Sequence, residues 1–474
     1  MNDDDIEMLD IFNKEKNVQE TRMSRLEQLE EPDIKKKDVE RPKIEVMKKS
    51  KKGKSKGTLT QKIFCLISAL FILGCIGYYG YRFIKYYRIY NPKVDSSDGS
   101  VLLAKDIVGK SEFATDDEDG LFSSSGNYIY RGDVNNNYLR YNNMLWRIVR
   151  INSDNSLDII LDDYISLLPW SSKVSSFTES DMYKYLNNDF LNLLDKDMLN
   201  QTSFCTDKIA DLSSITCENQ NSDSYVKLLD VANFLNSVNN GKSYLVNSDE
   251  IMWLSDYSED KIWHTNGVNV SQSLVNSFYE VRPMVRLKST TTYKEGEGSK
   301  DKPFIVGNED KLKVGSKVIL GEDTWIVYDN TNDIRLISNQ VIDKQMAFDN
   351  EKLTYKDSSL MTYLNDTYLN SLSYKDMIID NTWYIGEYKN SIDDIKNDSV
   401  KAKVGIPNIL DYKFDSSVNG YFTSTIREER VLVYENPLRP GKVTTYRNVR
   451  PCITISKENA NKLKYVDSVF KVGE

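Results

Sequence analysis

The pattern of hydrophobic and polar positions divides the chain into segments of different kinds. Residues 1–60 are mostly charged, whereas residues 63–81 carry no charge. From residue 127 onward, short apolar runs alternate with polar turns, which is typical of strands. Over 182–194 the apolar residues instead recur at three- and four-residue spacing, which predicts a helix. We therefore expect an α+β fold after the uncharged run.

The uncharged run over 63–81 predicts a membrane-spanning segment. As a helix it would be about 28 Å long, close to the hydrocarbon thickness of a bilayer. More lysines precede the run than follow it, so its N-terminal side is expected in the cytoplasm. We predict one transmembrane helix over 61–84, in contact with the lipid bilayer through 63–81, and extracellular C-terminal domains. A buried core helix is the alternative.

The tail before this run predicts a largely disordered cytoplasmic segment over 1–60. Met23, Leu26 and Leu29 recur at three-residue spacing, which would suit a short amphipathic helix that docks a cytosolic partner. A leader whose lysines only set the membrane orientation is the alternative.

The remainder of the chain repeats itself. Three segments occur twice in the same order, about 170–180 residues apart, which indicates a tandem duplication. They are Leu145-Trp146-Arg147-Ile148-Val149 with Thr324-Trp325-Ile326-Val327-Tyr328, the Tyr-Leu-Asn triplets that start at Tyr185 and Tyr363, and the Val-Arg-Pro triplets that start at Val281 and Val449.

These matches divide the extracellular part into four segments: 85–126 as linker and lead-in, 127–290 as the first domain, 291–313 as a linker and 314–474 as the second domain. Each domain is expected to begin with a hairpin, formed by 145–151 with 159–161 and by 325–328 with 334–337. Pro283 and Pro451 lack an N–H, so each should lie at a strand edge, a bulge or a strand start.

One run of residues resembles a known family. It reads Tyr130-Arg131-Gly132-Asp133-Val134-Asn135-Asn136-Asn137-Tyr138 and leads into 145–152, with Val281-Arg282-Pro283 later. This pattern resembles the DUF6273-type domain of Gram-positive surface and membrane proteins, which is similar to the C-type-lectin-like fold of formylglycine-generating enzymes. The resemblance implies two tandem lectin-like domains with short antiparallel sheets and flanking helices. It brings no established activity.

Composition narrows the possible functions. The 474 residues carry a net charge of −9, which argues against a nucleic-acid binder, because such proteins need a basic face. The single histidine, His264, excludes a multi-histidine metal site. The sequence contains no phosphate-binding loop, dinucleotide glycine pattern, CxxC pair or nucleophile elbow, so we expect no metal, no cofactor and no catalysis.

Candidate binding residues are aromatic side chains in irregular segments, which could stack on sugar rings or anchor a protein partner. They are Trp170, Trp253, Trp263, Trp383 and Tyr421, together with His264 beside Trp263. Packing in the core is the alternative for each of them.

The cysteines suggest one structural bond. A disulfide between Cys205 and Cys217 would close a short loop and contribute roughly 3 kcal/mol to stability, with two free thiols as the alternative. Cys452 follows Arg450-Pro451, but the first copy has Met284 at this place, which favours buried packing over a nucleophile.

We therefore expect a single-pass, membrane-anchored extracellular binding protein of a Gram-positive bacterium. Its tandem domains would bind a cell-wall glycan or a surface protein without chemistry. A transmembrane sensor or envelope-assembly factor, coupled to a cytosolic partner through the tail, is the alternative. An enzyme related to the formylglycine-generating group ranks third.

Overall fold

The computed structural model describes residues 68, 72–82, 99–174, 176–215, 218–247, 250–415 and 417–472. The chain divides into two units at Ile76, and both repeats belong to the second unit, Gly77–Glu474. The predicted cytoplasmic tail lies outside the described residues, as do 61–67 and 69–71 of the predicted transmembrane helix.

The predicted α+β class is wrong, because the described part of the chain is mainly β. Strands account for 35% and helices for 20% of its residues. The helices are short, and most of the core is formed by sheets of up to eleven strands rather than by the short sheets we expected. The fold class also included a transmembrane helix. No helix among the residues described is both long enough and apolar enough to cross a bilayer.

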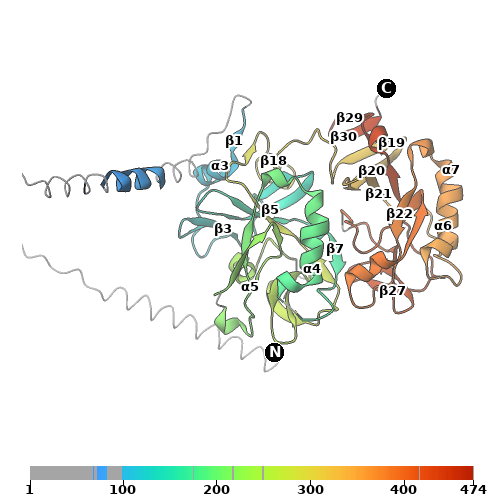
Figure 1. Ribbon diagram of the computed structural model, residues 1–474, viewed down its shortest axis with the longest axis horizontal. Helices are drawn as coiled ribbons and strands as arrows, with labels where there is room; N and C mark the ends of the chain where they lie inside the picture. The colour runs from blue at the N-terminus through green and yellow to red at the C-terminus, as the bar shows by residue number, and fades with distance from the viewer. Residues whose placement is uncertain are drawn as a thin grey trace, which may run out of the picture. The chain divides into compact units, whose positions relative to one another are not determined.

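The first repeat is built on an eleven-stranded sheet (Figure 1). Its main path runs in the order β1-β17-β18-β4-β5-β6-β16-β11, with β2, β3 and β8 attached beside it. The strands of this sheet are β1 (Val101–Leu102), β2 (Gly120–Ser124), β3 (Asn127–Arg131), β4 (Tyr138–Tyr141), β5 (Met144–Ile151), β6 (Leu157–Leu161), β8 (Leu199–Asn200), β11 (Val226–Lys227), β16 (Met284–Leu287), β17 (Thr292–Tyr293) and β18 (Phe304–Val306). β17 and β18 therefore place parts of the predicted linker in the first sheet.

Smaller sheets and short helices complete this repeat. The further strands are β7 (Ser166–Leu168), β9 (Thr202–Cys205), β10 (Gln220–Ser224), β12 (Trp253–Tyr257), β13 (Ile262–Asn266), β14 (Asn269–Ser273) and β15 (Tyr279–Val281). The helical segments are α3 (Leu103–Lys110), η1 (Phe177–Glu179), α4 (Asp181–Lys184), η2 (Tyr185–Asp189), η3 (Phe190–Leu193), η4 (Lys196–Met198), η5 (Leu212–Ser214) and α5 (Val231–Ser237).

The second repeat has a seven-stranded sheet in the order β24-β28-β21-β20-β19-β30-β29. Its strands and those of the two smaller sheets are β19 (Lys317–Leu320), β20 (Asp323–Asp329), β21 (Ile334–Ser338), β22 (Asn381–Tyr384), β23 (Ser399–Ala402), β24 (Val404–Gly405), β25 (Tyr421–Arg427), β26 (Arg430–Tyr434), β27 (Arg439–Gly441), β28 (Cys452–Ile455), β29 (Leu463–Val466) and β30 (Val469–Val472). Its helical segments are η6 (Tyr355–Asp357), α6 (Ser359–Tyr363), η7 (Leu364–Tyr368), α7 (Leu369–Ser371), η8 (Lys375–Met377), η9 (Ile392–Asn397) and α8 (Lys457–Ala460).

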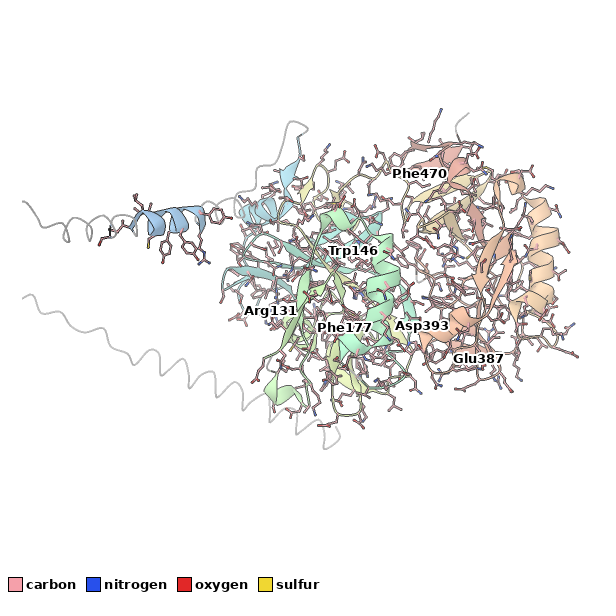
Figure 2. All side chains as sticks on the ribbon, viewed as in Figure 1. Arg131, Trp146, Phe177, Glu387, Asp393 and Phe470 are labelled. Carbon is pink, nitrogen blue, oxygen red and sulfur yellow. The ribbon has the colours of Figure 1, made fainter. Side chains whose placement is uncertain are left out.

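Both predicted hairpins are confirmed, since β5 pairs with β6 and β20 pairs with β21. Pro283 and Pro451 each lie directly before a strand, β16 and β28, where the missing N–H breaks no ladder. Trp146 and Trp325, which recur in the two copies, are fully buried (Trp146 in Figure 2).

An asparagine holds the helical segment of each repeat against the sheet. The side chain of Asn187 donates to the carbonyl of Val226 (2.9 Å) and accepts from its N–H (3.1 Å). Asn365 makes the same pair of bonds with Val404, at 3.0 and 3.0 Å. Each side chain satisfies both backbone groups of a strand residue, as a neighbouring strand would. This explains why the Tyr-Leu-Asn triplet occurs twice.

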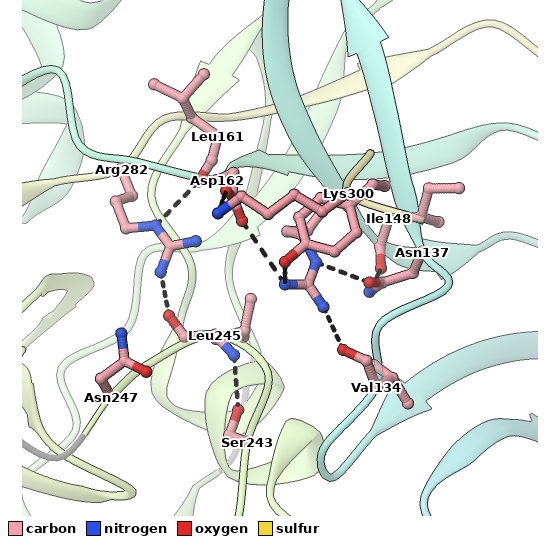
Figure 3. A network of polar contacts seen from close by, with 12 residues as sticks. Val134, Asn137, Ile148, Leu161, Asp162, Ser243, Leu245, Asn247, Arg282 and Lys300 are labelled. Atoms are coloured by element: carbon pink, nitrogen blue, oxygen red, sulfur yellow. Dashed lines mark hydrogen bonds and ion pairs between the residues drawn. The ribbon is translucent and has the colours of Figure 1, made fainter. Parts of the chain in front are cut away.

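In each repeat, the arginine of the Val-Arg-Pro triplet is buried and its hydrogen bonds connect a loop to a strand. Arg282 donates through Nε to the carbonyl of Leu161 (2.9 Å) and through a terminal nitrogen to that of Leu245 (Figure 3). In the second repeat Arg450 makes the corresponding bonds, to Ser338 (2.8 Å) and Lys413 (2.7 Å). The motif thus has a structural role in both copies.

The asparagine contact generates a first prediction. In the Asn365→Ala variant, the N–H of Val404 loses its partner and the carbonyl keeps only the hydroxyl of Tyr355 (3.0 Å), so unfolding should become easier by roughly 1–3 kcal/mol in urea titrations. Asn370→Ala is the matched control, because this exposed asparagine bonds no strand: it donates to the carbonyl of Asp366 (2.7 Å) and accepts from the ammonium of Lys375 (3.1 Å). An equal loss in both variants would contradict the role given to Asn365.

A buried carboxyl at the junction of the repeats gives a second prediction. Glu280 is 2% exposed and accepts a hydrogen bond from Asn436 at 2.6 Å. Burial, and next the charge of Glu250, raise the pKa of Glu280 to about 8. The folded chain therefore keeps a proton that the unfolded chain releases near pH 4.5, so the stability from this group is lost as pH rises toward 8.

Glu280→Gln keeps an acceptor for Asn436 but cannot ionise. We expect its stability relative to the unmodified protein to rise between pH 5 and 8 by a few kcal/mol, measured as the difference in unfolding free energy. Glu458→Gln, which changes a side chain that is 87% exposed, should leave the pH profile unchanged. Parallel profiles for Glu280→Gln and the unmodified protein would show that Glu280 ionises normally.

Candidate functional site

A polar cleft of about 470 Å³ lies where the two repeats meet. Its volume falls within the range of roughly 300–1,000 Å³ that small-molecule sites occupy. Tyr185 and Asp189 line it from the helical segment of the first repeat, while Tyr328 and Arg335 line it from β20 and β21. Asp411 completes this set from the loop after β24.

The loop over 407–411 is held in one shape by its own side chains. The N–H of Asn408 donates to the carboxylate of Asp411 (2.8 Å), and the N–H of Leu410 donates to the side chain of Asn408 (2.7 Å). The buried ammonium of Lys413 donates to the carbonyls of Asn408 and Asp411. Burial lowers the pKa of Lys413 to about 8.

The same loop is fixed to the first repeat. The hydroxyl of Tyr185 donates to the carbonyl of Leu410 (2.6 Å), and that of Ser166 donates to the carbonyl of Ile409 (2.5 Å). An ion pair between Lys396 and Asp189 (3.1 Å), two residues that line the cleft, also joins the two repeats. The walls of the cleft are therefore held together by direct contacts.

Arg335 is a charged residue of the cleft that is held by several contacts. One of its terminal nitrogens donates to the carbonyl of Thr382 (2.6 Å), and its guanidinium lies 5.2 Å from the ring centre of Trp383. Burial would lower the pKa of Arg335, but Tyr328, Asp411 and Asp329 together raise it above its ordinary value. The guanidinium keeps its charge, and 18% of the side chain remains exposed.

Tyr328 lies beside this charge with an unsatisfied hydroxyl. The residue is 3% exposed, and its hydroxyl has no hydrogen-bond partner in the described part of the chain. Burial raises the pKa of Tyr328 well above its usual range, so the group is a neutral phenol that can donate and accept. A buried polar group without a partner costs stability unless something satisfies it.

The lining of the cleft is mainly polar and charged. Its residues are tyrosines, a phenylalanine, two leucines, asparagines, threonines, aspartates and two cations: Tyr185, Asp189, Phe190, Asn192, Leu193, Tyr328, Asp329, Thr331, Asn332, Asp333, Arg335, Asn381, Thr382, Tyr384, Lys396, Asn408, Leu410, Asp411, Tyr412 and Thr454. No serine, cysteine or histidine occurs among these lining residues.

The aromatic residues predicted from the sequence as binding candidates lie in the core instead. All are at most 5% exposed, and none lines this cleft: Trp170, Trp253, Trp263, His264, Trp383 and Tyr421. The prediction depended on exposed rings, which the structure does not provide. Trp170 and Trp253 pack together at 6.0 Å, and His264 adjoins Trp253 at 6.1 Å. The sheet needs these large side chains to fill its interior.

His264 is satisfied by its neighbours. Its Nδ1 lies 2.8 Å from the carbonyl of Thr265 and its Nε2 lies 2.9 Å from the hydroxyl of Ser273. Burial lowers the pKa of His264, which favours the neutral ring. Trp383 is the one predicted residue close to the cleft, because its ring lies behind the guanidinium of Arg335.

Two cysteines have different environments. Cys452 is free and fully buried, and burial raises the pKa of its thiol far above the usual range, which does not suit a nucleophile. Cys205 is disulfide-bonded. Cys217 lies outside the described residues, so its predicted pairing with Cys205 stays a prediction. The next residue, Glu218, donates its N–H to the carboxylate of Asp207 at 2.6 Å.

Non-reducing peptide mapping tests that pairing. We expect one peptide pair that contains Cys205 and Cys217, which reduction separates. A pair that links Cys205 to any other cysteine would contradict the prediction.

The comparisons with known proteins add no relative. No family model, no curated protein and no solved structure matches the chain.

Proposed function

We propose that the two repeats form a non-enzymatic binding protein of the cell envelope, and that the cleft between them binds a glycan. The observation that carries this proposal is the buried, unpartnered hydroxyl of Tyr328, a residue that lines the polar cleft together with the charged Arg335. A sugar offers many hydroxyl groups that both donate and accept, which suits such a set of side chains.

The rest of the lining supports the same ligand class. The amides, carboxylates and threonine hydroxyls can bond sugar hydroxyls, and the tyrosine rings offer flat apolar area for the faces of the sugar. The resemblance of the first repeat to a lectin-like family also favours binding over catalysis. The location at the membrane stays a prediction from the sequence.

Tyr328→Phe removes only the unpartnered hydroxyl and tests the proposal. The full-length protein should bind protein-free cell walls saturably, and the variant should bind roughly 3- to 10-fold more weakly, because one hydrogen bond to the ligand is lost. Binding is measured by depletion from solution over a range of wall concentrations.

Tyr446→Phe is the matched control, because it removes a hydroxyl from a tyrosine that is 66% exposed. It should bind walls as the unmodified protein does. No saturable retention on walls, or equal retention of the Tyr328→Phe variant, would refute the glycan proposal.

A further inference from the structure

The first repeat contains a cavity at the position equivalent to the cleft. The N–H groups of Ser255 and Ser424 donate to the carbonyls of Leu229 and Pro407 in the two repeats, each at 2.9 Å. Two residues after these carbonyls, the N–H of Val231 donates to the carboxylate of Asp256 (2.6 Å), as that of Ile409 donates to the hydroxyl of Thr425 (3.1 Å). The two lining segments are therefore structural equivalents.

The charges in these equivalent positions are rearranged between the repeats. Across β5, β6 and β16 the cross-strand row reads Arg150, Asp158, Arg286. Across β20, β21 and β28 the corresponding row reads Asp329, Arg335, Thr454. The pair Asp230 and Asn233 likewise becomes Asn408 and Asp411. Two pockets with one scaffold and different charges are suited to different ligands.

The cavity in the first repeat has a volume of about 250 Å³. It has room for more than one water molecule, each of which occupies roughly 30 Å³ in the liquid. It is smaller than the roughly 300–1,000 Å³ of sites for drug-sized molecules. Its ligand would therefore be a small molecule rather than a chain.

Most charged groups around the cavity already have partners. Arg286 makes a bidentate pair with Asp158, at 2.6 and 3.0 Å. Asp230 accepts from the N–H of Asn233 at 2.7 Å and from its side chain at 2.5 Å. Lys227 donates to the carbonyl of Ser203 at 3.3 Å.

Among the residues that line this cavity, one hydrogen-bond acceptor and one hydrogen-bond donor have no partner within the part of the chain that the structure describes. Asp256 is 2% exposed, and its Oδ1 has no hydrogen-bond partner among the residues described, although its Oδ2 accepts from Val231. The Nε of Arg150 is also buried without a partner in the same set of residues, while a terminal nitrogen donates to Asn233. Both residues line the cavity, so one unsatisfied acceptor and one unsatisfied donor belong to the same lining.

We propose that this cavity is a second binding site, and that its ligand is a small zwitterion of the α-amino-acid class. The ammonium group of the ligand bonds Oδ1 of Asp256, and its carboxylate bonds Nε of Arg150, with Lys227 nearby in the lining. Because the charges of Arg286 and Asp158 neutralise each other, Arg150 and Lys227 balance Asp230 and Asp256. A neutral set of opposite charges matches a ligand that carries both.

Calorimetric titration of the full-length protein with glycine and with each enantiomer of alanine tests this site. At least one should bind saturably at one site per chain, whereas acetate and methylammonium, which each carry half of the zwitterion, should bind at least about 10-fold more weakly. Binding should weaken by about 10- to 100-fold in Asp256→Asn, because a charged hydrogen bond is lost. Asp260→Asn, which makes the same change at an exposed position, should bind normally.

Dependence on pH in the unmodified protein gives a second readout that needs no variant. The groups that face Asp256 are Asp230 and Lys227, with Arg150 and Arg286 also in the lining. Burial, and next the charge of Asp230, raise the pKa of Asp256 to about 7. Protonation removes the acceptor of the ligand's ammonium group, so affinity should fall by up to about 100-fold between pH 8 and pH 5.

Absence of binding by all three amino acids, or the same affinity in Asp256→Asn, would overturn the proposal. Equal binding of methylammonium alone would also overturn it and would identify a simple cation site. None of these outcomes bears on the cleft between the repeats, because Tyr328 lines that cleft and not this cavity.

Discussion

Each repeat depends on one asparagine side chain that takes the place of a neighbouring strand. Asn187 and Asn365 satisfy both backbone groups of Val226 and Val404, and so attach a very short edge strand, β11 or β24, to the helical segment. The residues that follow each of these strands line the cavity of the first repeat and the cleft. A strand of two residues has too few ladder bonds to fix the next segment by itself. Asn187 therefore positions the segment that lines the cavity of the first repeat, and Asn365 positions the segment that lines the cleft.

Residues that stabilise the fold recur in both repeats, whereas residues that line the pockets differ between them. The buried tryptophans, the asparagines and the arginines of the Val-Arg-Pro triplets keep their roles in both repeats. The residues of the central strands that line the pockets do not, since Arg150 corresponds to Asp329. A scaffold residue must satisfy the same backbone groups in each copy, whereas a pocket residue is constrained only by its ligand.

The sequence predicted local structure well and the site poorly, for one physical reason. Hairpins such as β5 with β6 follow from alternation along the chain, and the duplication follows from matching segments. The predicted fold class was wrong because the spacing of apolar residues predicts a helix over 182–194 but does not show how many strands join one sheet. The predicted binding residues lie apart from the candidate cleft because large aromatic residues such as Trp253 fill the interior. Tyr328 and Arg335 looked like ordinary strand residues. Comparison of the charges at matched positions of the two copies would have indicated them.

The difference in charge between the two pockets also bears on why the domain is duplicated. Two identical sites would raise the avidity for one repeated ligand through effective concentration. Sites that differ in charge do not cooperate in this way, since a ligand that fits the row Arg150, Asp158, Arg286 meets different charges on the row Asp329, Arg335, Thr454. Direct bonds between the repeats, such as that from Tyr185 to Leu410, further fix the two sites in one body. The duplication is therefore better explained as a way to hold two different ligands, or two parts of one ligand, at a fixed separation.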